Sequence, residues 1–275
     1  RRRLRLRPPG IRIHFSGGMS TKETGGGKMY VCYSRSKNES HAKAVLYHLE
    51  NWGFTMPEED GEKNIMREVT YEQECESIAR HQEAVVVLTP QLIQDITALV
   101  ELDILKSSFE KGRIKIVVFL YGVESSTLPQ RLSWLGKAQL VRVTGMESVF
   151  EGMCHAVAVR IEEELFKQGD FNSCKKKFYA FLARDAYLKR IFREYTSLEA
   201  YAAGTKIVLI YAMYCYIEMR YTTRITEPFY GNCIRKLYEN VDYYTQWGTL
   251  QLRIAERSLF LSICHMKEIP EEKAV

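Results

Sequence analysis

The chain has 275 residues, 46% of them apolar and 27% charged, which is ordinary for a globular protein and excludes a wholly disordered one. Residues 1–28 hold eight Lys or Arg and one Glu, residues 29–168 hold fifteen against twenty-one acids, and residues 169–275 hold sixteen against twelve. These counts give net charges of +7, −6 and +4, so the overall charge of +5 says little about the partners of the middle segment.

The first 28 residues predict a disordered basic leader. They contain six arginines, two prolines and the run 25–27 of three glycines, and they offer too little apolar surface to offset the entropy lost on ordering. The positive charge also allows an electrostatic contact with nucleic acid or anionic lipid. A solvated leader is the favoured interpretation.

Cysteine usage and hydropathy indicate a cytoplasmic protein. The seven cysteines lack CxxC spacing, and several lie in apolar surroundings, so we expect buried, reduced thiols. The longest apolar run, residues 207–217, is too short to span a membrane, and the basic start lacks the apolar part of a secretory signal. We therefore expect no membrane span in this stretch. The cysteines are Cys32, Cys75, Cys154, Cys174, Cys215, Cys233 and Cys264.

Order is expected to begin at Met29, where residues 29–33 read as a short strand. A helix follows, with Ala42, Val45 and Leu49 on one face, and Gly53 ends it. Residues 54–56 predict a second strand. The acidic loop 57–64 comes directly after it, at a position where α/β sheets tend to build binding surfaces.

The clearest pattern is a strand, helix, strand unit between residues 84 and 120. The runs 84–89 and 114–120 are apolar throughout, which is typical of strands covered on both faces. Pro90 ends the first run, and the segment between the runs is long enough for a crossover helix that contains Glu101. With a further strand at 138–143 and a helix after it, the sequence predicts an α/β fold: a five-stranded, flavodoxin-like parallel sheet with helices on both faces.

Residues 169–275 predict a small all-α segment of unknown family. Twelve of the seventeen tyrosines lie there, and apolar residues follow helical spacing in several runs. Tyr216 and Tyr238 head YxxM and YxN motifs of the kind that SH2 domains bind after phosphorylation. Packing of these rings in a helical core is the favoured interpretation.

Residues 29 to about 168 resemble Toll/interleukin-1 receptor (TIR) domains. MYVCYS, followed by a helix ending in LENWGF, is similar to the first conserved box of that family. ESIARHQEAVVVLTPQLIQD resembles its second helix and third strand. The stretch from VELDIL to LPQRLSWL is similar to the receptor-type third helix, fourth strand and following loop. The order of these stretches makes the resemblance specific.

The chain departs from the family at three places. The loop that commonly carries RDxxPG reads PEEDGEKN and keeps only an acidic residue, Asp60, and a glycine, Gly61. Thr97 and Ala98 stand where the family has Trp-Cys before its third helix. The Asp that usually follows the Tyr-Ser of the first box is absent. We therefore expect a choice of partners that differs from that of TIR domains.

The resemblance implies innate-immune-type signalling by an adaptor or a receptor tail that associates with itself or with other TIR domains. The third-helix region and the loop after the second strand are the implied contacts. That loop comprises Pro57, Glu58, Glu59, Asp60, Gly61 and Glu62. A SEFIR-like adaptor, of the class found in interleukin-17 signalling, is a weaker alternative.

A second function is implied because some TIR domains cleave NAD with a Glu that matches Glu101. A carboxylate held against the ribose stabilises the positive charge that develops during cleavage. Tyr33 and Ser34 are then expected to contact NAD. However, Glu101 and Asp103 can point outward from an amphipathic helix, so a solvated or helix-interface carboxylate is the favoured interpretation of Glu101. We expect no metal site, no cofactor other than NAD as a substrate, and no specific nucleic acid.

Overall fold

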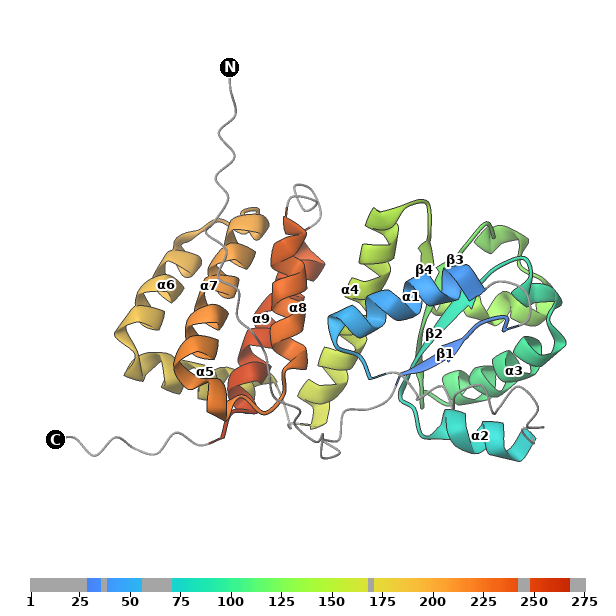
Figure 1. Cartoon of the computed structure of the whole chain (residues 1–275), viewed down its shortest axis with the longest axis horizontal. Helices are drawn as coiled ribbons and strands as arrows, with labels where there is room; N and C mark the ends of the chain where they lie inside the picture. Colours follow the sequence, from blue (N-terminus) through green and yellow to red (C-terminus); the bar gives the residue numbers. More distant parts are fainter. Residues whose placement is uncertain (1–28, 36–38, 56–70, 168–170, 242–247, 268–275) are drawn as a thin grey trace, which may run out of the picture.

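The computed structural model of the protein describes residues 29–35, 39–55, 71–167, 171–241 and 248–267 (Figure 1). Strands and helices alternate first: β1 (Tyr30–Cys32), α1 (Glu39–Trp52), α2 (Tyr71–Ala79), β2 (Glu83–Leu88), α3 (Ile96–Glu110), β3 (Lys115–Leu120), β4 (Gln139–Arg142) and α4 (Met146–Lys167). Helices follow: α5 (Phe171–Arg184), α6 (Ala186–Ser197), α7 (Ala203–Tyr221), α8 (Phe229–Glu239) and α9 (Thr249–Cys264). Short 3-10 turns are η1 (Leu92–Gln94), η2 (Ser125–Thr127), η3 (Gln130–Lys137) and η4 (Thr222–Arg224).

The four strands form one parallel sheet in the order β1-β2-β3-β4. Val85 of β2 lies level with Val31 of β1 and with Val117 of β3. Helices α1 and α4 cover one face of the sheet, and α2 and α3 cover the other (Figure 1). Burial on both faces explains why β2 and β3 are apolar almost without interruption, as the sequence predicts.

The predicted five-stranded, flavodoxin-like sheet is not confirmed, because four strands are found in the described part of the chain. Phe54 and Thr55, predicted to begin the second strand, lie outside any strand, and residue 56 is outside the described residues. The buried Phe54 ring packs edge-on against Phe229 of α8, with ring centroids 5.1 Å apart. A contact with a helix far along the chain thus takes the place of strand pairing.

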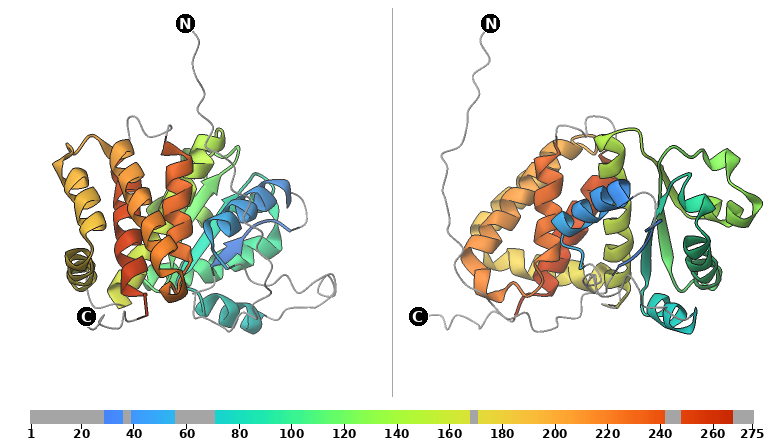
Figure 2. Two further views of the ribbon diagram at one scale, coloured as in Figure 1. Left: turned by 60° about the vertical axis from the view of Figure 1, so that its left-hand side comes forward. Right: turned by 45° about the vertical axis from the view of Figure 1, so that its right-hand side comes forward.

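Helices α5 to α9 form a bundle on the α1 and α4 side of the sheet (Figure 2). One apolar cluster runs from Phe119 of the sheet through Met153 and Val157 of α4 to Leu259 of α9. The predicted boundary near residue 168 falls within 168–170, outside the described residues. The segments on its two sides share a core, while their separate folding stays a prediction.

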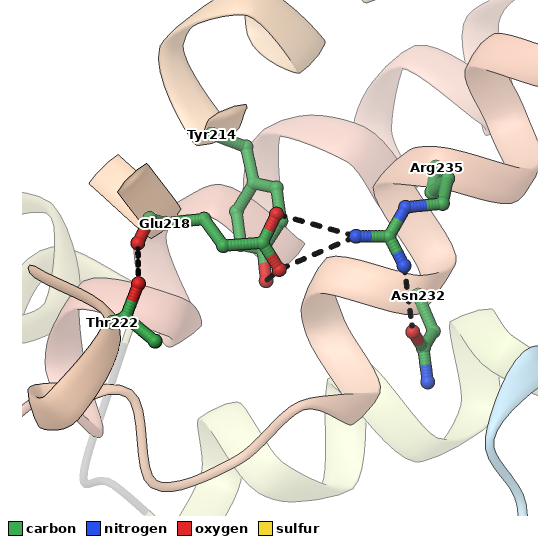
Figure 3. A network of polar contacts seen from close by, with 5 residues as sticks. All are labelled: Tyr214, Glu218, Thr222, Asn232 and Arg235. Carbon is green, nitrogen blue, oxygen red and sulfur yellow. Dashed lines mark hydrogen bonds and ion pairs between the residues drawn. The ribbon is translucent and has the colours of Figure 1, made fainter. Parts of the chain in front are cut away.

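A polar network joins α7 to α8 inside this bundle (Figure 3). Arg235 donates from Nη2 to both carboxylate oxygens of Glu218, each at 3.3 Å, and from Nη1 to Asn232 Oδ1 at 3.4 Å. The Tyr214 hydroxyl donates to the same carboxylate at 3.4 Å, and Thr222 bonds the backbone carbonyl of Glu218. Glu218, part of the YxxM motif, therefore has a structural role between the two helices.

The two motif tyrosines differ from the favoured interpretation of core packing, because Tyr216 is only partly buried and Tyr238 is 37% exposed, although both rings contact other rings of the bundle. The Tyr216 hydroxyl donates to Asp185 at 2.8 Å, and its ring lies 4.6 Å from that of Tyr187. Tyr238 stacks on Tyr211 with centroids 4.0 Å apart. Recognition of either motif by an SH2 domain would require these contacts to open.

Close packing of α4 on the sheet gives the first prediction. A Cβ atom at Gly152 would lie 2.2 Å from Cε1 of Phe119, whose ring is fully buried. We expect Gly152→Ala to lower the free energy of unfolding by about 1–3 kcal/mol in urea denaturation, because the ring or the helix must shift. The control is Gly136→Ala, where an added Cβ meets nothing within 4 Å. Equal stability of the two variants would contradict this packing.

Candidate functional site

The candidate site lies at the carboxyl edge of the parallel sheet, where β1 ends and α3 begins. Asp95 caps α3 by accepting hydrogen bonds at Oδ1 from the backbone N–H groups of Thr97, at 3.1 Å, and Ala98, at 3.3 Å. Its Oδ2 accepts from the hydroxyl of buried Ser34 at 2.7 Å. The end of β1 is thereby tied to the start of α3, at the edge where open α/β sheets bind ligands.

Glu101 lies inside this corner, and its predicted outward direction is wrong. Its side chain is only 5% exposed, and Oε2 accepts a hydrogen bond from the Tyr30 hydroxyl at 3.0 Å. Arg35 Nη2 lies 3.7 Å from Oε1. Of the favoured interpretation, the solvated carboxylate is therefore corrected: Glu101 is buried between α3 and β1 and has partners. Asp103 is exposed, as predicted.

The helical period explains the error. The face of α3 that packs on the sheet carries Ala98, Leu102 and Leu105, and Glu101 falls on it, three residues after Ala98 and four before Leu105. If Leu99 is taken as a core residue, the helical period places Glu101 on the solvent side. This assignment is wrong, because Leu99 is only partly buried.

Side chains alternate between the two faces of the sheet along β1, and this alternation places the other predicted site residues on different faces. Tyr30 and Cys32 face α3, while Val31 and half-buried Tyr33 pack in the apolar cluster on the α1 and α4 side. The structure therefore brings Ser34 to the Glu101 side and places Tyr33 on the opposite face of the sheet. The proposed interaction loop, residues 57–62, lies outside the described residues.

Two site residues, Tyr30 and Arg35, are not predicted from the sequence. Because Tyr30 is two residues before Cys32, strand alternation alone could have placed its side chain beside α3. Arg35 had no comparable pattern. Its side chain is 60% exposed, so its guanidinium links the buried Glu101 to the surface. A carboxylate that is held by a phenol and a guanidinium can stabilise a neighbouring positive charge, provided that a ligand reaches it.

A second ionisable cluster lies at the opposite edge of the sheet. Burial raises the pKa of Glu83, at the start of β2, to about 8, and the nearby Glu163 of α4 adds to the rise, whereas Arg160, Lys115 and Lys167 oppose it. Burial also raises the pKa of Glu163. Perturbed carboxyl groups often mark functional sites, but this pair lies at the amino edge of the strands, away from the ligand-binding edge.

A pocket of about 380 Å³ opens between α1, α4 and α8. Trp52 and Phe150 lie on its apolar side, with ring centroids 5.5 Å apart. Lys236 lines its polar side, and its ammonium lies 2.8 Å from Glu239. The pocket is on the bundle side of the sheet, so it is not part of the Glu101 site.

The described part of the chain contains neither a cluster of metal-ligating side chains nor a membrane-spanning helix. Within these ranges, no group of three or more His, Cys, Asp or Glu side chains could hold a metal ion. No helix found there is long and apolar enough to cross a membrane.

Comparisons with known proteins add no identification, since no protein family, curated protein or solved structure matches the chain. The resemblance to TIR domains therefore stays a prediction that rests on the motifs and their order.

The acid pair gives a pH prediction. Glu83 binds its proton more tightly in the folded protein than at its ordinary pKa of 4.5, so it contributes stability below that pH, and this stability is lost as the pH rises through about 8. We expect the free energy of unfolding to fall by about 1–3 kcal/mol between these limits, and Glu83→Gln to remove most of the fall. Urea denaturation across pH measures it. Glu110→Gln, at an exposed position, is the control, and an unchanged pH dependence in Glu83→Gln refutes the assignment.

Proposed function

We propose that the chain is a TIR-type signalling module, an adaptor or receptor tail, that associates with other copies or other TIR domains through its third helix, α3. The observation that carries this proposal is an exposed apolar pair on α3. Ile96 is 79% exposed and Val100 is 37% exposed. The two are four residues apart, so they lie on one side of the helix and offer one patch.

Charged groups accompany this patch on the exposed part of α3. Asp103 pairs with Arg131 of η3, whose Nη2 lies 2.5 Å from Oδ2. An apolar centre with a polar rim is the usual anatomy of a protein interface. Asp95 at the N-terminus of α3 bonds Ser34, and Glu101 on its buried side bonds Tyr30, so the helix presents this surface from a fixed position.

The association is tested with Ile96→Asp. A buried charge at an interface is costly, so we expect self-association, measured by light scattering over a range of concentrations, to weaken roughly tenfold or more. Met219→Asp on α7 is the matched control, because Met219 is 76% exposed and lies in the bundle. If both variants associate as the unaltered chain does, α3 is not the interface.

A second candidate function, cleavage of NAD at its nicotinamide bond, is favoured by the burial of Glu101 at the carboxyl edge of the sheet. Tyr30 and Arg35 hold the carboxylate in a defined position, as stabilisation of a cationic transition state requires. The carboxylate is largely covered, however, so a substrate would have to displace part of its surroundings. This leaves association as the first proposal.

Nicotinamide release by the full chain at high protein concentration separates the two functions. If the chain is an NAD-cleaving enzyme, Glu101→Gln should lower the rate by about 10²–10³ while preserving the shape of the side chain. Tyr30→Phe, which removes one hydrogen bond to that carboxylate, should lower the rate less. Glu110→Gln on the same helix is the control. No release by the unaltered chain, with self-association intact, eliminates the enzymatic function and leaves the signalling one.

A further inference from the structure

Helices α5 and α6 carry an exposed cluster of positive charge, here called the basic face. The two helices contain seven Lys or Arg and two acids, when the linking Asp185 is counted with them. They follow one another through that single residue and contact each other. The exposed members of the basic face are Lys176, Lys177, Arg184, Lys189, Arg190 and Arg193.

The charges of the basic face are not neutralised within the described part of the chain, where none of the six forms an ion pair. Cations elsewhere commonly have an acidic partner, in the pairs Arg80–Glu76, Arg131–Asp103, Arg142–Glu124, Arg235–Glu218 and Arg257–Glu162. Like charges on neighbouring helices repel one another, and a polyanion relieves this repulsion.

One of the two acids of these helices, Asp185, is occupied by other contacts. Asp185 is buried, and its Oδ1 accepts from the backbone N–H groups of Tyr187 and Leu188, each at 3.0 Å. Its Oδ2 accepts from the Tyr216 hydroxyl and lies 3.9 Å from Arg220 of α7. This carboxylate caps α6 and faces α7, so it does not offset the charge of the basic face. Glu194 of α6 is the other acid.

Two exposed tyrosines lie among these cations. The Lys175 ammonium lies 5.9 Å from the centroid of the Tyr179 ring. The Tyr187 ring already contacts Arg190, 5.3 Å from its centroid, and the Tyr216 ring, 4.6 Å away. Aromatic rings beside Lys and Arg suit single-stranded nucleic acid, because bases stack on the rings while phosphates meet the cations.

An anionic membrane fits this face less well. Helices that lie in a membrane surface insert an apolar face, but the apolar faces of α5 and α6, with Phe178, Leu182, Leu188 and Ile191, are buried in the bundle. Helix α6 also lies at the end of the molecule far from the sheet, where a long polyanion can pass (Figure 1).

We propose that the basic face binds single-stranded nucleic acid without sequence preference, through contacts of Lys and Arg with phosphates and stacking of a base on Tyr179. This activity goes beyond the proposed signalling function and uses a different surface.

The test uses the full chain, a fluorescein-labelled oligothymidylate of roughly 20 nucleotides and fluorescence anisotropy at low salt. Lys176→Glu combined with Lys189→Glu reverses one charge on each helix. We expect about tenfold weaker binding and a less steep dependence of the affinity on salt, by about 0.7 in the logarithmic slope for each phosphate that the variant no longer neutralises. The milder change of both residues to Gln should weaken binding by an intermediate factor.

The matched control is Lys111→Glu combined with Arg113→Glu, which changes the net charge equally at exposed positions after α3. It should weaken binding less than about twofold. The basic residues 1–28 are the same in every variant, so a difference between the two double variants arises from the substituted positions. Equal weakening by patch and control variants overturns the proposal. So does failure of the unaltered chain to bind the oligonucleotide, or patch-dependent binding to phosphatidylserine vesicles without patch-dependent binding to the oligonucleotide.

Discussion

The packing of α4 on two partners at once is the constraint on which the rest of the structure depends. Gly152 faces the sheet, where its missing Cβ leaves room for the Phe119 ring. Cys154, two residues on, contacts Gln251 of α9 and lies near Cys233 of α8, in surroundings so apolar that burial raises its pKa far above the ordinary value. A helix that is buried on both sides makes the sheet and the bundle parts of one core, so it cannot have an exposed polar face along its middle.

This arrangement decides which surfaces remain available. The bundle covers the α1 and α4 side of the sheet, with Phe54 and Arg160 packed against Phe229 of α8, where the Arg160 guanidinium lies 4.4 Å from the ring centroid. The α3 side carries Glu101 within and Ile96 outside, and the bundle does not cover it. The helical segment thus covers one side of the α/β unit and leaves the opposite side, where we propose association, uncovered by the bundle.

The sequence pattern was sufficient to predict a helix or strand and its buried face where apolar residues recur with the period of that element. The apolar runs that form β2 and β3 predicted a parallel sheet covered on both faces, and Pro90 marked the end of β2. The sequence pattern gave a wrong prediction where contact with a segment far along the chain determines the local structure. Phe54 is buried by α8 instead of a neighbouring strand, and no local period indicates that choice. The prediction for Glu101 was wrong for a different reason: helical faces are assigned by placing charged residues toward solvent, and Glu101 lies on the core side. Its burial is possible because Tyr30 and Arg35 provide polar partners for the carboxylate.

The two proposed surfaces have a physical consequence for each other. The exposed patch on α3 and the basic face on α5 and α6 belong to opposite ends of the molecule, so one can be occupied while the other is free. Association through α3 would place several basic faces on one assembly. A polyanion bound to one of them would then meet a second basic face at a high effective concentration, which strengthens its binding. Binding of the strand and association of the chains would strengthen each other without any change of conformation, because each favours the same assembled state.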